Sequence, residues 1–280
     1  MDPNRIGIIG GGNMARALIG GLLESGLAQS AVQVGEPDSA VRGALALDFG
    51  VFVTDDNRTA IEGCSLVILA VKPQQVARVL GALAPVLALA RPLVLSVAAG
   101  IRTASLAQWC GGAAVVRAMP NRPALVGAGA TGLYAAPGIG AAQRHLAEQV
   151  MRAVGPAVWV DTEDQLDAVT ALSGSGPAYF FLLAELMAQA AVRQGLPQEA
   201  ARVLAVGTLH GAGALAHASD GDLARLRAEV TSPGGTTAAA LGVFAAAGLA
   251  GMVEQAMEAA AARGRELAMQ FGAAGGAPGA

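Results

Sequence analysis

The first half of the chain alternates short apolar runs with longer segments in which apolar residues recur every three or four positions. One such longer segment, residues 13–25, has the periodicity of a helix and stops at Gly26. Strands that alternate with helices predict an α/β fold, a doubly wound parallel sheet of the Rossmann type. The apolar runs read as strands are residues 5–9, 31–35, 66–70, 93–97 and 114–118.

The strand pattern disappears after Asp161, and helical segments then follow one another. One begins with Pro177 in its first turn and ends at Gly195. The helices are apolar on more than one face, which predicts a bundle whose surface is buried against a second subunit. We therefore expect a dinucleotide-binding domain over 1–160 and an all-helical substrate and dimerisation domain over 161–280, with a disordered tail over 271–280.

Composition narrows the class of protein. The 280 residues are 54% hydrophobic and 14% charged, and the net charge is −3. The absence of a basic block and the scarcity of aromatic residues argue against a nucleic-acid partner. Gly, Pro, Arg or Asp interrupts each apolar stretch before the roughly 20 residues of a membrane span. Neither a signal-peptide pattern nor a CxxC pair is present, so we expect a cytoplasmic protein without a metal centre.

A glycine turn follows the first predicted strand. Gly10, Gly12 and Ala15 match the pattern GxGxx[GA] between a strand and a helix. In this pattern the first glycine permits a tight turn and the second removes the side chain where the backbone approaches a pyrophosphate. The third small residue lets helix and strand pack closely. Free N–H groups at the helix start bind phosphate, which predicts a dinucleotide cofactor.

Three further loops are expected at the same edge of the sheet, beyond the C-terminal ends of the strands. Lys72, the only lysine of the chain, could reach a ribose or phosphate of the cofactor. Ala98, Ala99 and Gly100 are small enough for a nicotinamide ring to lie against their backbone. Asn121 supplies an amide at the same edge and is also expected to contact the cofactor.

Glu36 follows the second predicted strand, about twenty residues after the glycine turn. A carboxylate at this place accepts hydrogen bonds from the ribose hydroxyls of adenosine and repels a 2′-phosphate. It therefore favours NADH over NADPH. The alternative is a solvated carboxylate in an ordinary turn.

A Ser-Pro-Gly-Gly-Thr-Thr run at residues 232–237 opens an alanine-rich helical segment. Ser232 is expected to cap the helix, and Pro233 to lie in its first turn. The bare glycine backbone and the threonine hydroxyls suggest a pocket for a small carboxylate. No acid or base is nearby, which fits hydride transfer to an activated C=N bond with Thr237 as the catalytic hydrogen-bond partner. The expected binding residues are Ser232, Gly234, Gly235, Thr236 and Thr237.

Together these motifs resemble those of the pyrroline-5-carboxylate reductase family, over roughly residues 4–270. The most specific matches are RAMPNRPALVGAG, ALSGSGPAYFF and EVTSPGGTT. The resemblance implies reduction of L-1-pyrroline-5-carboxylate to L-proline by NAD(P)H. It also implies a homodimer through the C-terminal helices, which often assembles further into a decamer.

The resemblance further implies roles for individual residues. Ser175 would begin one side of the substrate pocket, beside the 232–237 turn. Glu36 departs from the family, which commonly has a serine, threonine, asparagine or arginine-containing turn there, and this departure indicates that NADH is used at least as well as NADPH. The implied cofactor contacts are Gly10, Gly12, Asn13, Met14 and Ala15 for the phosphates, Asn57, Ala70, Val71, Lys72 and Pro73 for the adenosine side, and Ala98, Ala99 and Gly100 for the nicotinamide.

Three alternatives stay open at this point. A β-hydroxyacid dehydrogenase of the same architecture would need a catalytic lysine on the connecting helix, and residues 161–195 contain none. A catalytically silent dinucleotide-binding regulator would have no use for the 232–237 pocket. A reductase of a related cyclic imine acid would use the same residues.

Overall fold

The computed structural model describes residues 5–219 and 221–274. The chain forms two compact units: the first runs up to Gly174 and includes the residues from Ala260 on, and the second is Ser175–Ala259. The units thus divide after the segment that follows the last strand, and not at the 160/161 boundary of the sequence analysis. The last helix contributes to both units.

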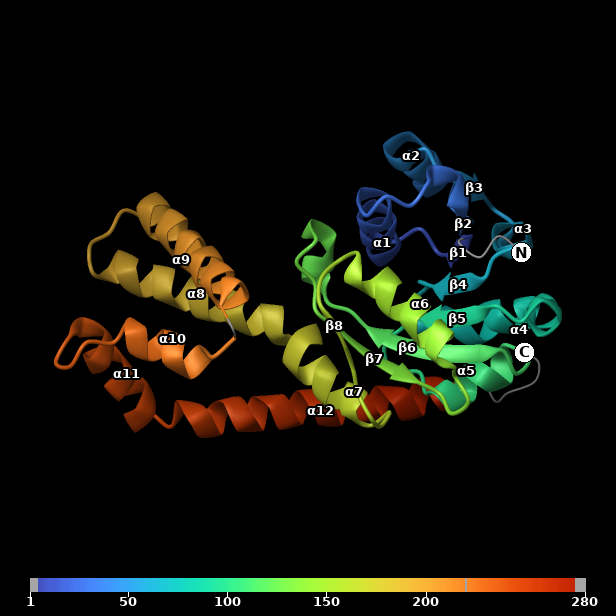
Figure 1. The fold of residues 1–280 in the computed structure, drawn as a ribbon. Coiled ribbons are helices and arrows are strands. Elements are labelled where there is room, and N and C mark those ends of the chain that lie inside the picture. Colours follow the sequence, from blue (N-terminus) through green and yellow to red (C-terminus); the bar gives the residue numbers. More distant parts are fainter. Residues whose placement is uncertain (1–4, 220, 275–280) are drawn as a thin grey trace. The chain divides into compact units, whose positions relative to one another are not determined.

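The first unit is built on one eight-stranded sheet in the order β3-β2-β1-β4-β5-β6-β7-β8 (Figure 1). Strands β1 to β6 are parallel, β7 is antiparallel to β6, and β8 is parallel to β7. The order 3-2-1-4-5-6 is that of a Rossmann fold, which confirms the expected doubly wound sheet. The strands are β1 Ile6–Ile9, β2 Val32–Gly35, β3 Phe52–Thr54, β4 Leu66–Leu69, β5 Leu93–Ser96, β6 Ala114–Met119, β7 Thr131–Ala135 and β8 Ala157–Trp159.

Three of these strands are absent from the sequence analysis. β3 and β8 have three residues each and lie at the two edges of the sheet, and β7 contains a glycine. The two three-residue runs carry too little periodicity to be recognised locally, and the glycine in β7 weakens its strand signal. The connecting helices are α1 Asn13–Glu24, α2 Ser39–Phe49, α3 Asn57–Ile61, α4 Pro73–Ala90, α5 Thr103–Trp109, α6 Ala141–Arg152 and α7 Gln165–Val169, with short helical turns η1 Gln29–Ala31, η2 Arg122–Val126 and η3 Thr170–Gly174.

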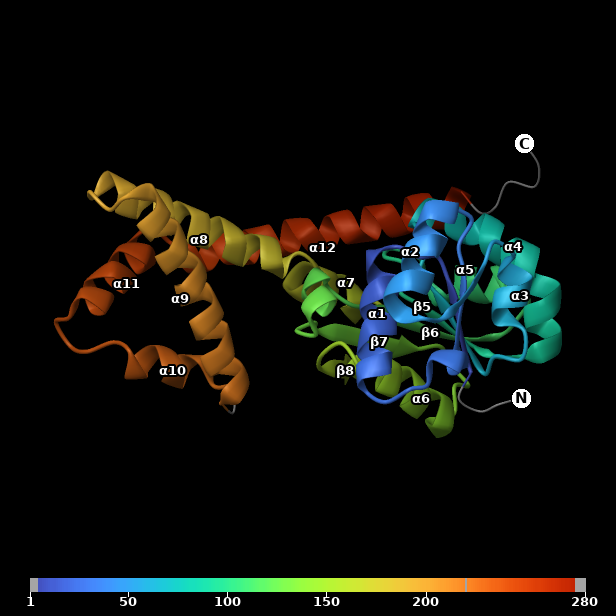
Figure 2. The ribbon, with the colours of Figure 1, turned by 90° about the horizontal axis from the view of Figure 1, so that it is seen from above.

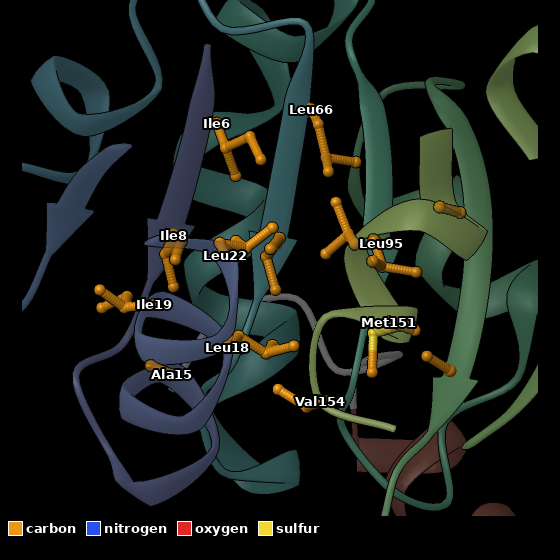
Figure 3. Close-up of a cluster of buried hydrophobic side chains, with 14 of the residues drawn as sticks. Ile6, Ile8, Ala15, Leu18, Ile19, Leu22, Leu66, Leu95, Met151 and Val154 are labelled. Atoms are coloured by element: carbon orange, nitrogen blue, oxygen red, sulfur yellow. The ribbon is translucent and has the colours of Figure 1, made fainter. Parts of the chain in front are cut away.

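The sheet is buried on both faces, because successive side chains of each strand point to opposite sides. Ile6 and Ile8 of β1 lie in one cluster with Leu18 and Leu22 of α1, and Met151 of α6 packs into the same cluster (Figure 3). Strand residues that point to the opposite face, such as Ile9, Val67 and Val94, lie in a second cluster with residues of α4 and α5. Continuous apolar strands therefore build two cores from one sheet.

Among the described residues, α4 is the only individual helix that is long and apolar enough to span a membrane. The bent pair α11 and α12 meets the same criteria of length and hydropathy when it is taken as one segment. In α4 the buried residues Val76, Leu80, Leu83 and Leu87 recur at helical spacing and belong to the second core cluster. This face accounts for the apolar composition of α4 as packing against the sheet.

The second unit is helical and has almost no core of its own. α8 and α9 lie side by side (Figure 1, Figure 2). Only Gly176 and Ala201 are buried among its described residues, whereas Phe180, Phe181 and Leu182 are each more than half exposed. Apolar surface on this scale is typical of an interface between subunits. The helices are α8 Gly176–Arg193, α9 Gln198–Ala218, α10 Leu223–Glu229, α11 Thr236–Ala246 and the start of α12 Leu249–Ala274.

The prediction of a disordered tail over residues 271–280 is wrong for residues 271–274, which belong to helix α12. α12 continues to Ala274, and Phe271 is partly buried against the second core cluster. Alanine favours a helix and Gly272 disfavours it, and the contact of Phe271 with the core helps the helix to continue past this glycine. The rest of the expected tail, 275–280, lies outside the described residues.

We predict that both cysteines of the native protein are inert toward thiol reagents. Burial raises the pKa of the Cys64 thiol to about 11, and burial also raises the pKa of Cys110. The reactive thiolate is therefore scarce at pH 8, and the reagent has no access. Alkylation with iodoacetamide at pH 8, followed by mass spectrometry, should modify both residues in urea and neither without it. Rapid modification of the folded protein would contradict this prediction.

Candidate active site

The parallel register of β1 to β6 brings the predicted cofactor loops to one edge of the first unit. Ile9 aligns with Gly35 and Leu69, Leu69 aligns with Ser96, and Ser96 aligns with Arg117. The segments that follow these strands include residues 10–15, 36–38, 70–73, 97–102 and 120–122. The expectation that these loops share an edge is confirmed.

The turn between β1 and α1 has the geometry of a phosphate-binding loop. Gly10 has φ +97°, and its N–H donates to the Gly35 carbonyl at 2.8 Å. A Cβ on Gly10 would lie 2.7 Å from the Ala70 carbonyl oxygen, so glycine is required on steric grounds as well. Ala15 is fully buried and lets α1 pack closely on the sheet.

The start of α1 is open to a ligand. Gly12 is the N-cap residue, no side chain caps the helix, and no acidic residue lies in its first turn. A Cβ on Gly12 would meet no atom within 4 Å, while Asn13 is exposed and Met14 half-buried beside it. Uncapped N–H groups at a helix start, with free space before them, are suited to binding an anion.

Glu36 is held directly beside this turn. Its Oε2 accepts the Gly11 N–H at 2.7 Å, and its Oε1 accepts the Asp38 N–H at 2.9 Å. Arg42 folds back over the same segment, where its Nη1 donates to the carbonyl oxygens of Glu36 at 2.8 Å and Pro37 at 2.7 Å. The sequence places Arg42 a helix turn or more beyond Glu36, and the fold brings its guanidinium back over this segment. The Arg42 guanidinium therefore lies close to Glu36, the residue that is expected to bind the ribose hydroxyls.

Asn57 and the segment 70–73 lie at the same edge. Asn57 is the first residue of α3, and its buried Oδ1 has no hydrogen-bond partner among the described residues. The side chain packs on Gly35, where a Cβ would collide with this oxygen. Lys72 is the N-cap residue of α4 and is exposed, with Pro73 after it as the first helical residue.

The loop between β5 and α5, residues 97–102, presents a mostly bare backbone. Ala98 is buried and its N–H donates to Ser96 Oγ at 3.3 Å, whereas Ala99 is exposed. Gly100 has φ +72°, a conformation that favours glycine. The loop ends at Arg102, the N-cap residue of α5.

A cluster of charged residues ties this loop to the segment after β8. Arg102 pairs with Asp164 at 2.7 Å and with Asp167 at 3.0 Å. Glu163 accepts from Arg117 Nη1 at 2.6 Å and from the backbone N–H of Thr103 at 2.6 Å. Burial lowers the pKa of Arg117, and the hydrogen bond with Glu163 opposes that shift. The residue pattern alone does not predict this cluster, although an arginine inside the apolar strand β6 is a signal for a buried ion pair.

Asn121 has structural partners in this unit. Its Nδ2 donates to the Ser173 carbonyl at 3.0 Å, and its Oδ1 accepts the Ala130 N–H at 2.8 Å. The side chain is buried. The amide thus links the end of β6 to the η3 turn, the last turn before the second unit.

In the second unit, the 232–237 run forms a tight turn followed by an uncapped helix. The Gly235 N–H donates to the Ser232 carbonyl at 3.0 Å, with Pro233 and Gly234 between them and φ +73° at Gly234. Proline followed by a glycine of positive φ is typical of a type II turn. The N-cap residue is Gly235, without a side-chain cap. Ser232 therefore does not cap the helix, and Pro233 precedes it, because α11 begins only at Thr236.

This turn leaves the first amides of α11 accessible. Ser232 and Thr236 are exposed and Thr237 is half-buried. A Cβ on Gly235 would meet Ser232 Oγ, a hydroxyl that can rotate away, and the Ser232 carbonyl oxygen at 3.2 Å. Ser175, the N-cap residue of α8, also makes no side-chain capping bond. Donors without a charged side chain can hold a carboxylate here, and they offer no acid or base.

The chain matches proteins of known kind over almost its full length. It is 47% identical over 273 residues to the pyrroline-5-carboxylate reductase of Pseudomonas aeruginosa, covering 97% of this chain and 100% of that protein. It is 41% identical to the enzyme of Mycobacterium tuberculosis, with 94% and 96% covered. The chain belongs to the pyrroline-5-carboxylate reductase family.

Family descriptions and solved structures agree with this assignment. Residues 163–267 match the family pyrroline-5-carboxylate reductase dimerisation, and residues 5–100 match the family NADP oxidoreductase coenzyme F420-dependent. The pyrroline-5-carboxylate reductase structure from Coxiella burnetii has a TM-score of 0.92 at 40% identity, covering 95% of this chain and 99% of that one. The Plasmodium falciparum pyrroline carboxylate reductase, solved with NADP bound, has a TM-score of 0.80 at 25% identity, covering 96% and 99%.

Membership of the pyrroline-5-carboxylate reductase family removes the case for a β-hydroxyacid dehydrogenase, which the missing lysine already disfavoured. The exposed apolar surface of the second unit is also explained, because this unit lies within the residues that match the dimerisation family. Among the described residues, no group of three His, Cys, Asp or Glu side chains is placed to hold a metal ion.

Proposed function

We propose that this reductase converts L-1-pyrroline-5-carboxylate into L-proline with a hydride from NADH or NADPH. The observation that carries the proposal is the uncapped start of α11, where amides and two threonine hydroxyls gather without an ionisable side chain. A protonated cyclic imine needs an anion site for its carboxylate and a hydrogen-bond partner at nitrogen. It needs no proton transfer during hydride addition, because the product nitrogen keeps the proton that it already has.

The cofactor edge of the first unit fits a dinucleotide. The open N–H groups before α1 and the space in front of Gly12 suit the pyrophosphate. When bound, NAD(P)H supplies the hydride. Lys72 adds an exposed cation at the ribose side, and Asn121 acts as a positioning residue through its internal bonds. The residues proposed to hold the cofactor are Gly10, Gly12, Asn13, Met14, Ala15, Glu36, Asn57, Ala70, Val71, Lys72, Pro73, Ala98, Ala99 and Gly100.

The substrate residues act by orientation. We propose that the amides of Thr236 and Thr237 bind the substrate carboxylate at the positive end of α11. The Thr237 hydroxyl accepts the imine N–H and holds the C=N bond for attack. Ser175, Ser232, Gly234 and Gly235 complete the pocket.

We predict that NADH is used at least as well as NADPH. A carboxylate has about four acceptor positions, so Glu36 can bind ribose hydroxyls while it keeps the Gly11 and Asp38 amides. A 2′-phosphate would meet this negative charge, while the nearby Arg42 guanidinium is engaged with the Glu36 and Pro37 carbonyls. In Glu36→Ser, kcat/KM for NADPH relative to NADH should rise about tenfold to a hundredfold, because a hydrogen bond to a charged group contributes about 1.5–3 kcal/mol.

The matched control for this prediction is Glu24→Ser, which removes an exposed carboxylate at the far end of α1. Its cofactor ratio should equal that of the wild type. A strong NADPH preference of the wild-type enzyme, or an unchanged ratio in Glu36→Ser, would refute the role of Glu36.

The reaction is tested by following NADH and NADPH oxidation at 340 nm with pyrroline-5-carboxylate and with its six-membered homologue. Turnover of the five-membered imine acid at the higher kcat/KM is the expected result. A preference for the six-membered ring would favour a related imine reductase. Tight cofactor binding without turnover would favour a silent regulatory protein.

We further propose a homodimer through the exposed apolar helices of the second unit, located in the cytoplasm and able to assemble into a decamer. The half-exposed Phe180, Phe181 and Leu182 on α8 support the dimer, because such residues seldom remain in contact with water. Sedimentation velocity of the wild type and of Phe181→Glu distinguishes the states. The wild type should sediment as a dimer or larger, and the variant should shift toward the monomer.

A further inference from the structure

We propose that Phe271, near the end of α12, is a positioning residue of the cofactor site. Its ring supports the β5–α5 loop at Gly100 and thereby sets the backbone against which the nicotinamide lies. This inference rests on the proposed function, which places the nicotinamide beside residues 98–100.

Phe271 and its neighbour Ala268 lie directly on Gly100. A Cβ placed on Gly100 would be 3.3 Å from Cδ2 of the Phe271 ring and 3.6 Å from the Ala268 backbone nitrogen. Both residues belong to the same compact unit as the loop, and Ala268 is buried. The ring therefore covers the bare α-carbon of the residue that turns the loop.

The loop is fixed at its two ends by other groups. Ser96 Oγ accepts the Ala98 N–H at the β5 end, and Asp164 and Asp167 hold Arg102 at the α5 end. Between these anchors, the three atoms nearest to the side-chain position of Gly100 all belong to α12. The end of α12 therefore supports the middle of the loop.

The same stretch of α12 also lies along the start of α5. One groove of the first unit is shared between Arg102 and Ser105 on one side and the α12 residues on the other. Gly264 approaches Asp167, the acid that pairs with Arg102. The α12 residues that line the groove are Ala262, Arg265, Glu266, Ala268, Met269 and Gly272.

Support of this loop matters because hydride transfer depends steeply on geometry. A misplacement of about 1 Å can lower a rate by about a hundredfold. Without the ring, Gly100 is free to sample the broad range of conformations that glycine allows. The cofactor would then bind less tightly, and its ring would be held less closely against the substrate.

The test compares Phe271→Ala with Met269→Ala, which shortens a side chain that is 69% exposed on the same helix. We expect Phe271→Ala to lower kcat about tenfold and to raise the Kd for NADH about threefold to tenfold. The isotope effect with NADH deuterated at the transferred position should rise, because hydride transfer becomes slower than the other steps. Phe271→Leu, which keeps apolar cover, should restore most of kcat, and Met269→Ala should match the wild type.

A purely structural role of Phe271 would lower the melting temperature and leave Kd, KM and the isotope effect of the folded fraction unchanged, and that result would overturn the proposal. Equal kinetic effects in both alanine variants would overturn it as well. The Kd for NADH is read from nicotinamide fluorescence without turnover. Wild-type inactivity toward the imine would thus count against the proposed reaction, while an unchanged Kd in Phe271→Ala would count against this inference.

Discussion

Replacing Thr237 by valine should lower kcat about a hundredfold, because the hydroxyl is proposed to orient the imine and a misplacement of about 1 Å can lower a rate by that factor. Valine keeps the shape of threonine and removes only the hydroxyl that is proposed to hold the imine nitrogen. Thr237 is half-buried in the first turn of α11 and does not cap the helix, so the helix should tolerate the exchange. The Kd for NADH should stay at its wild-type value, because this hydroxyl is proposed to contact the substrate and not the cofactor.

Thr231→Val is the matched control, since it removes a hydroxyl from the same loop. The Thr231 hydroxyl donates to the Arg227 carbonyl at 2.6 Å and is used within the fold. Its loss should reduce stability slightly and leave kcat within about twofold, as one internal hydrogen bond contributes about 1 kcal/mol. A Thr237→Val enzyme with wild-type kcat would remove this hydroxyl from the mechanism.

Replacing Glu163 by glutamine should lower the free energy of unfolding by about 3–5 kcal/mol, the cost of leaving one charge of a buried pair without its partner. Arg117 is almost completely buried on β6, and Glu163 is its hydrogen-bonded counter-ion. Glutamine also weakens the bonds that Glu163 accepts from the backbone and hydroxyl of Thr103. Urea unfolding followed by circular dichroism measures the change.

Glu199→Gln provides the comparison for this prediction. Glu199 pairs with Arg202 on α9, and both side chains are more than 60% exposed. Water screens such a pair, so its loss should produce no measurable change in unfolding. If Glu163→Gln unfolds at the same urea concentration as Glu199→Gln, the cluster around Arg117 does not stabilise the fold.

Local features of the chain were sufficient to predict the centre of the fold. The glycine turn, the apolar strand before it and the helix after it form one contiguous segment, and each part restricts backbone conformation through its own residues. The helices of the second half were equally local, because Pro177 and Gly195 mark the two ends of α8 within two residues.

Features set by distant contacts could not be predicted in this way. β3 and β8 exist because a neighbouring strand pairs with each, and three residues alone show no periodicity. Glu163 and Arg102 look like ordinary solvated charges until the fold brings β6, α5 and the segment after β8 together. Phe271 stands before a glycine-rich tail, and only its contact with Gly100 reveals an ordered helix end. In the 232–237 turn, Ser232 and Pro233 lie before the helix, and Gly235 takes the N-cap position that the sequence assigned to Ser232.

The most direct test is a crystal structure of the protein with NADH and an unreactive proline analogue, tetrahydrofuran-2-carboxylate. We predict that the analogue carboxylate accepts hydrogen bonds from the Thr236 and Thr237 amides, with the ring oxygen at the Thr237 hydroxyl and a ring carbon within about 3.5 Å of the nicotinamide. An analogue bound away from α11, or a nicotinamide remote from Gly100, would contradict the proposed site.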